Sequence, residues 1–173
     1  IVSDVMMPEM DGMEFCKYVK GKLEISHIPV IILTAKGNDE AKTKAISMGA
    51  NAYIIKPFSK DYLVARIEQL LNERKLFRER VWQQPEEHKE EQDTYEQFLV
   101  KKDVQFIEKI HQVIEENLDN SDFNIDTIAS TIGLSRSAFF KKLKSLTGFA
   151  PVDLVKEIRL NKSIELIKNS DMS

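Results

Sequence analysis

Residues 28–35 read Ile-Pro-Val-Ile-Ile-Leu-Thr-Ala, an apolar run in which polar side chains do not alternate. Such a run is typical of a strand that is buried on both faces of a parallel sheet. Residues 52–55, Ala-Tyr-Ile-Ile, form a second run of this kind, and Ile1-Val2-Ser3 has the character of a short third strand. Since segments with helical spacing separate these runs, the pattern predicts an α/β fold with a parallel sheet.

Amphipathic helices are expected between and after these strands. Cys16 and Val19 belong to the apolar face of the first, and Ala45 to that of the second. Ser59 can cap a third helix, which carries a loosely heptad apolar stripe to about Trp82.

The chain divides into three parts. Residues 1–71 form the α/β domain, residues 72–102 comprise the extension of the third helix and a polar, charged linker, and residues 103–173 show only helical periodicity. We therefore expect an all-α domain after the linker.

Composition limits the class of protein. The chain has 173 residues, 42% of them hydrophobic, which is enough for two small cores. No apolar run reaches the roughly 18 residues that span a bilayer, and no secretory signal is visible, so no membrane contact is expected. Cys16 is the only cysteine, which suits a reducing cytoplasm.

Three polar residues are expected at adjacent strand ends. Asp4, Thr34 and Lys56 each stand where a predicted strand finishes, and the carboxyl ends of parallel strands are where such sheets place their chemistry. A carboxylate can act as a nucleophile toward phosphorus. The transferred group is strongly anionic, so a cation and a hydroxyl donor are suitable partners for it.

These residues carry a family resemblance. The segment Asp4-Val5-Met6-Met7-Pro8-Glu9-Met10-Asp11-Gly12, then residues 33–35, then Tyr53-Ile54-Ile55-Lys56-Pro57-Phe58, resemble two-component receiver domains, which have a flavodoxin-like fold. The resemblance implies that Asp4 is the phosphoacceptor and that Thr34 and Lys56 contact the phosphoryl group. It also implies an aromatic switch at Tyr53 that moves with Thr34, a cis Lys56–Pro57 bond, and a sensor histidine kinase as partner.

The resemblance also implies a Mg²⁺ site, in which Asp4 and the backbone carbonyl of Met6 are ligands. Receivers complete that site with an acidic pair on an earlier strand, and this sequence starts after the matching position. We therefore expect an incomplete sheet and weak or absent binding of Mg²⁺, which demands near-octahedral coordination by oxygen. The strand at residues 1–4 would be an uncovered sheet edge, so a homodimer could form through it or through the 59–82 helix.

The second domain contains a helix, a tight turn and a helix. Residues 125–132 carry the first apolar stripe, Gly133 permits the turn, and Ser135 can cap the next helix. Between residues 133 and 168 there are eight basic and three acidic side chains, which makes this stretch a candidate face for a polyanion. The side chains expected outward on the second helix, and hence to bind DNA, are Ser135, Arg136, Ser137, Phe140, Lys141 and Lys144.

This region resembles AraC-type regulators. The similarity continues through Lys144, Thr147-Gly148, Pro151 and residues 158–160. The family has two helix-turn-helix units joined by a long helix, and residues 152–167 have the pattern of that helix. A second unit is not in this sequence, so we expect only weak, salt-sensitive DNA binding.

Together these features predict a phosphorylation-controlled transcription regulator of a phosphorelay, and not an enzyme. The domain order is similar to the carboxyl end of hybrid sensor–regulators, so the kinase could be part of the same longer protein. One alternative is a receiver that serves as a protein-interaction module and whose helical domain does not bind DNA. A phosphatase of the aspartyl-phosphate type is disfavoured, because residues 5–8 offer no acid beside Asp4.

Overall fold

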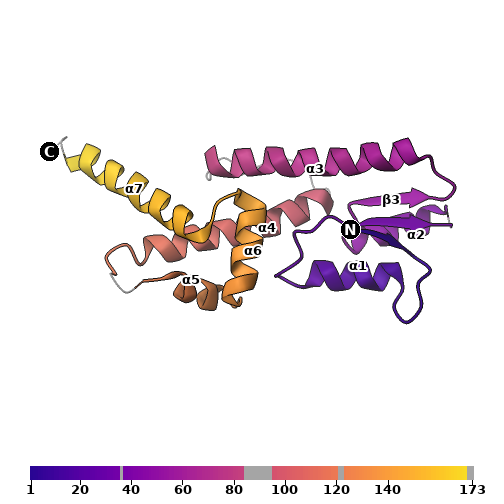
Figure 1. Ribbon diagram of the computed structural model, residues 1–173, viewed down its shortest axis with the longest axis horizontal. Coiled ribbons are helices and arrows are strands. Elements are labelled where there is room, and N and C mark those ends of the chain that lie inside the picture. Colours follow the sequence, from indigo (N-terminus) through magenta and orange to yellow (C-terminus); the bar gives the residue numbers. More distant parts are fainter. Residues whose placement is uncertain (36, 84–94, 121–122, 171–173) are drawn as a thin grey trace. The chain divides into compact units, whose positions relative to one another are not determined.

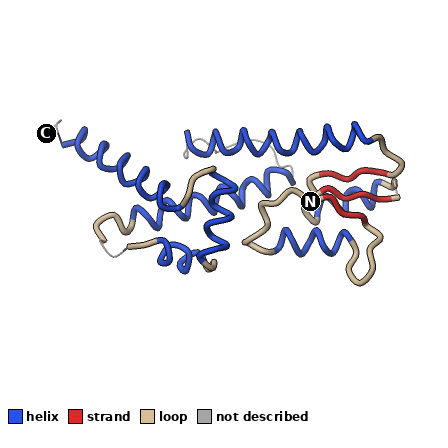
Figure 2. The backbone as a smooth tube through the Cα atoms, viewed as in Figure 1, coloured by secondary structure: helices blue, strands red, loops and turns tan. Residues whose placement is uncertain are grey.

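The computed structural model describes residues 1–35, 37–83, 95–120 and 123–170, and the chain forms two compact units, residues 1–102 and 103–173. The first unit contains a three-stranded parallel sheet, drawn in red in Figure 2. Strands β1 (Val2–Asp4), β2 (Ile31–Thr34) and β3 (Ala52–Ile55) lie in that order. The parallel α/β architecture expected from the apolar runs is confirmed.

Helices cover both faces of this sheet (Figure 1). Helices α1 (Gly12–Gly21) and α2 (Asp39–Ser47) pack on one face, where Ile32 is fully buried together with Cys16 and Ala45. Helix α3 (Lys60–Gln83) packs on the other face through Leu70, against Ile31 and Ile54. Neighbouring isoleucines of β2 thus face opposite cores, which is why Ile31, Ile32 and Leu33 are all apolar before the strand ends at Thr34.

Side-chain caps set where the helices begin. The Asp11 carboxylate accepts hydrogen bonds from the backbone N–H groups of Met13 and Glu14, both at 2.8 Å, and thereby starts α1. The Ser59 hydroxyl accepts from the Tyr62 N–H at 3.1 Å, as expected of a residue that caps α3.

In the described part of the second unit, all regular secondary structure is helical. Its elements are α4 (Tyr95–Glu115), α5 (Ile125–Ile132), α6 (Arg136–Thr147) and α7 (Pro151–Ser170). Helix α4 begins eight residues earlier than the helical pattern expected from residue 103, and its first residues belong to the unit that contains the sheet. The charged linker expected at residues 83–93 falls almost entirely outside the described residues.

The core of the second unit joins all four helices. Ile110 and Ile114 of α4, Leu143 of α6 and Leu154 of α7 have no exposed surface, and Ile128 of α5 is 1% exposed. Two glycines in left-handed backbone conformation end α5 and α6, Gly133 with φ 79° and Gly148 with φ 83°. Residues with a Cβ rarely adopt this conformation, so glycine is the natural choice at both turns.

Candidate functional site

An ion pair joins two strand ends in the first unit. Asp4 is the last residue of β1, Lys56 directly follows β3, and the Lys56 ammonium donates to Asp4 Oδ2. The Met6 N–H donates to the other carboxylate oxygen of Asp4 at 3.1 Å. The hydrogen bonds from Lys56 and then from Met6 lower the pKa of Asp4, so the carboxylate is held ionised. Both side chains remain open to solvent, at 36% exposure for Asp4 and 40% for Lys56.

Thr34 and Tyr53 lie on the two neighbouring strands. Thr34 ends β2 and is 3% exposed, and its carbonyl oxygen accepts from the Lys56 N–H at 2.7 Å. Tyr53, within β3, is partly buried against the core that α1 and α2 share with the sheet. The Lys56–Pro57 bond is cis, which confirms that expectation. The structure therefore places Asp4, Thr34 and Lys56 at adjoining strand ends.

Gly12 has a role that the sequence analysis did not single out. A Cβ at this position would lie 2.1 Å from the carbonyl oxygen of Asp4, far closer than any real contact. The Gly12 N–H also donates to the Val5 carbonyl at 3.0 Å. The first residue of α1 therefore contacts the backbone of Asp4 and Val5 directly. The sequence feature that could have indicated this close approach is the glycine at the end of the segment from Asp4 to Gly12.

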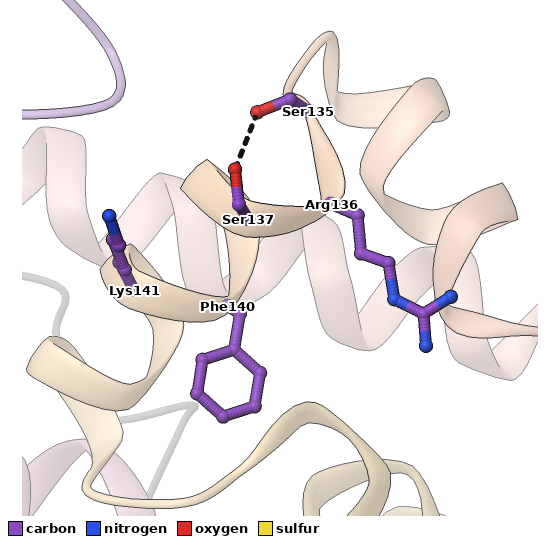
Figure 3. A pocket seen from close by; sticks show the side chains of 5 residues that line it. All are labelled: Ser135, Arg136, Ser137, Phe140 and Lys141. Carbon is purple, nitrogen blue, oxygen red and sulfur yellow. Dashed lines mark hydrogen bonds between the residues drawn. The ribbon is translucent and has the colours of Figure 1, made fainter.

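The second unit presents a helix, a turn and a helix with a polar outer face. After Gly133, the buried Leu134 fills the turn and the Ser135 hydroxyl accepts from the Ala138 N–H at 3.3 Å, which starts α6. All six side chains expected to face outward here are exposed: Ser135, Arg136, Ser137, Phe140, Lys141 and Lys144. Five of them, all except Lys144, line an open depression of about 600 Å³ (Figure 3).

Arg136 is engaged on this face. Its guanidinium lies 2.8 Å from Asp126 Oδ2, in the first turn of α5, and both side chains are well exposed. Exposed ion pairs contribute at most about 1 kcal/mol and exchange readily with other partners. The pair therefore orients Arg136 without removing it from the surface.

Two cations expected on the polyanion face are instead structural. Lys142 is fully buried, with its ammonium 3.0 Å from Asp103 Oδ1 and 4.9 Å from the centre of the Phe106 ring. The Arg159 guanidinium donates to the carbonyls of Asn117 and Asn120, at 3.4 and 3.3 Å. Both side chains bind partners within the second unit, so fewer cations face outward than the count of basic residues in the sequence suggests.

The family model described as the response regulator receiver domain matches residues 1–68. Residues 1–68 are a response regulator receiver domain. The match covers the sheet and most of the helices around it, including Asp4, Thr34 and Lys56, and it does not extend into the second unit.

Sequence relatives match either the whole chain or its first unit. The chain is 31% identical over all 173 residues to Histidine kinase P4 of Formosa agariphila, and it spans 12% of that protein's length. The receiver domain region is 41% identical over 71 residues to the phosphate regulon regulator PhoB of Escherichia coli, which covers 41% of this chain and 31% of PhoB. A solved receiver domain of a Syntrophus aciditrophicus histidine kinase is 30% identical and covers 54% of this chain and 61% of its own, with a TM-score of 0.39.

The donors around Asp4 do not by themselves suit the Mg²⁺ that receiver domains bind. The described residues include no group of three or more His, Cys, Asp or Glu side chains that could hold a metal. Both carboxylate oxygens of Asp4 already accept hydrogen bonds, and Asp11 caps α1. A single carboxylate and a backbone carbonyl leave most of an octahedral shell to other ligands.

None of the described helices is both long and apolar enough to cross a bilayer.

Proposed function

We propose that this chain is the receiver and output segment of a phosphorylation-controlled transcription regulator, in which Asp4 accepts the phosphoryl group. The observation that carries the proposal is the ion pair between Asp4 and Lys56 at the carboxyl ends of β1 and β3. The Asp4 carboxylate is an ionised, solvent-accessible nucleophile, and the Lys56 ammonium beside it can bind the anionic phosphoryl group after transfer.

The phosphoryl transfer then has a simple balance. A carboxylate oxygen of Asp4 attacks the phosphorus of a phosphohistidine on a sensor histidine kinase, and a P–O bond forms. The P–N bond breaks, and the imidazole leaves with its electron pair. Lys56 moves from the carboxylate to the phosphoryl oxygens, and the Thr34 hydroxyl meets the same group from β2. In this proposal the chain is the acceptor and not an enzyme.

Phosphorylation would reach the output by changing the surface around Thr34 and Tyr53. Tyr53 packs against the core beneath α1 and α2 and is paired with Ile32, two residues before Thr34 on β2. We propose that a movement of Thr34 toward the phosphoryl group changes the space available to the ring. This gives Tyr53 the role of the aromatic switch.

The output is proposed to be an AraC-type helix-turn-helix that binds DNA through α6. What supports this is the composition of the helix: α6 carries four basic residues and no acidic one, and Ser135, Ser137 and Lys141 gather at its exposed start. Hydroxyls and ammonium groups at a helix start are suited to phosphate oxygens and base edges.

The first experiment is chemical trapping of the acyl phosphate. The full chain is incubated with acetyl phosphate over a Mg²⁺ series, and the labelled residue is located by borohydride reduction and mass spectrometry. We expect slow labelling at Asp4 that needs high Mg²⁺, because few metal donors surround it. Asp4→Asn should abolish the label, whereas the control Asp11→Asn, which alters only a helix cap, should keep it. Label at a residue other than Asp4, or label that persists in Asp4→Asn, would refute the assignment.

A second candidate is favoured by the burial of Lys142 and the internal use of Arg159. With fewer outward cations, the unit could serve in protein interaction and not bind DNA. Affinity for mixed-sequence duplex DNA across a salt series separates the two functions, because phosphate contacts make log K fall linearly with log salt concentration. Absence of any salt-dependent binding would favour the interaction module.

Self-association through β1 or α3 is part of the proposal. Val2 on β1 is 44% exposed, and Leu71 on α3 is 59% exposed. An apolar edge strand and an apolar helix face can each pair with a second copy. Light scattering over a concentration range should detect a dimer. Dissociation by Val2→Lys would point to the strand, and dissociation by Leu71→Lys to the helix. A monomer at all concentrations would exclude both.

A further inference from the structure

Phe140 is an apolar side chain on an otherwise polar face. Of the phenylalanines whose side chains the structure describes, it is the only exposed one, at 42%, whereas its neighbour Phe139 is fully buried in the core. The core beneath α6 is therefore filled by Phe139, and Phe140 holds a large apolar surface toward solvent.

Charged and hydroxyl side chains surround this ring. Phe140 lines the open depression with Ser135, Arg136, Ser137 and Lys141, and in the view of Figure 3 its ring lies between Lys141 and Arg136. On the next turn, the Lys144 ammonium lies 5.8 Å from the ring centre. This cation–π contact favours one orientation of the ring and places a cation beside it.

The charge of the face selects a polyanion as the occupant. The sequence of α6 contains no acidic residue, and Arg136, Lys141 and Lys144 are all exposed. A DNA duplex offers phosphates to such cations, and its major groove offers one apolar group on the base edges, the C5-methyl of thymine.

We propose that Phe140 is a specificity-determining residue that recognises thymine by its C5-methyl group. The inference rests on the proposed DNA-binding function and adds to it a base preference. Lys141 and Lys144 hold the phosphate backbone, and the ring they flank packs against the methyl group.

The test removes that methyl group alone. Duplexes that bind the full chain are selected from a random pool, and each conserved thymine is then replaced by deoxyuridine. At one position we expect the unmodified protein to lose affinity about three- to fivefold, the effect of one buried methyl group. Phe140→Ala should bind thymine and uracil equally there, and Phe140→Leu should retain part of the preference.

Two further variants sharpen the result. Phe140→Gln should shift the preference at that position from thymine to adenine, because an amide pairs with the adenine edge. Lys141→Ala is the matched control, since it should weaken all sequences equally and reduce the salt slope by about one while keeping the thymine preference.

The outcomes separate this inference from the proposed function. If no duplex is bound, both fail. If duplexes are bound but no thymine-to-uracil change matters, or if the thymine preference survives in Phe140→Ala, the role of Phe140 is wrong and DNA binding stands. If Phe140→Ala unfolds at a clearly lower temperature than the parent, and Phe140→Leu restores stability without restoring the preference, the ring is structural and the inference is overturned.

Discussion

Lys142 on α6 and Asp103 on α4, 39 residues apart, form an ion pair in which the lysine is fully buried and the aspartate is 15% exposed. The ammonium also lies over the Phe106 ring, so its charge is balanced by a carboxylate and an aromatic face. The pair thereby links the helix that enters the second unit to the helix proposed to meet DNA.

Removing either partner of this pair should be costly, because the remaining charge is left unpaired, on a fully buried lysine or on a largely buried aspartate. We expect Lys142→Met and Asp103→Asn each to lower the free energy of unfolding of the second unit by roughly 3 kcal/mol. The double variant Lys142→Met/Asp103→Asn should lose less than the sum of the two single losses, since no charge is then left unpaired. Urea unfolding followed by circular dichroism measures this. Additive losses in the double variant would contradict a coupled pair.

Gly12→Ala should disturb the proposed phosphorylation site, because the new methyl group would collide with the Asp4 carbonyl. We expect a loss of stability of about 2 kcal/mol or more and slower labelling of Asp4. Gly21→Ala, at the other end of α1, is the control. Nothing lies within 4 Å of its Cβ position, so stability should rise by about 0.5 kcal/mol. Equal effects of the two substitutions would show that the close approach does not matter.

Lys20→Met should destabilise the first unit. Lys20 is 6% exposed, and its ammonium donates to the Ile28 carbonyl at 2.7 Å, the Asn51 side-chain oxygen at 2.9 Å and the Ser26 carbonyl at 3.3 Å. The Asn51 oxygen keeps a second donor, the Val30 N–H at 2.9 Å, whereas the carbonyls of Ile28 and Ser26 lose the ammonium. A buried acceptor left without a donor costs about 1–3 kcal/mol. Lys17→Met, on the exposed side of α1, should change stability by less than about 0.5 kcal/mol. Thermal unfolding compares the two, and similar midpoints would disprove a structural role for Lys20.

Acidification should destabilise the second unit through His111. Burial lowers the pKa of His111 from its ordinary value of 6.5, although Glu115 opposes the shift. Between the lowered pKa and 6.5 the unfolded chain binds more protons than the folded one, so stability falls as the pH drops through this range. His111→Gln should flatten that dependence. Unfolding curves between pH 7.5 and about 5 test this, and parallel curves for parent and variant would exclude the histidine as the cause.

Much of the first unit followed from residue order alone. Apolar runs without alternation mark strands that are buried on both faces, and Asp4, Thr34 and Lys56 stand at strand ends by position. The lengths of the strands could not be predicted as well. The apolar run extends from residue 28 to 35, but β2 covers only Ile31–Thr34. The length of β2 depends on hydrogen bonds to the strands on either side. Only Val2–Asp4 of β1 and Ala52–Ile55 of β3 pair with it, so β2 is shorter than the apolar run.

Burial of charged side chains could not be predicted. Lys141 and Lys142 are neighbours in sequence, yet one is exposed and the other is fully buried. Helical periodicity could place Lys142 on the inner side, but its partner Asp103 is remote in sequence and only the folded chain brings them together. The same holds for Lys20 and Asn51. Counting basic residues therefore overestimated the outward charge of the second unit.

The hydrogen bonds of α3 have a mechanical consequence for the sheet. Arg66 donates to the carbonyl of Asn51, just before β3, and Arg74 to that of His27, before β2. Lys20 donates to the same loops, so side chains hold β2 and β3 where they begin, whereas Thr34 and Lys56 stand where they end. Because these hydrogen bonds hold the starts of β2 and β3, we expect a small displacement at their carboxyl ends to tilt the strands while α3 stays attached to the sheet.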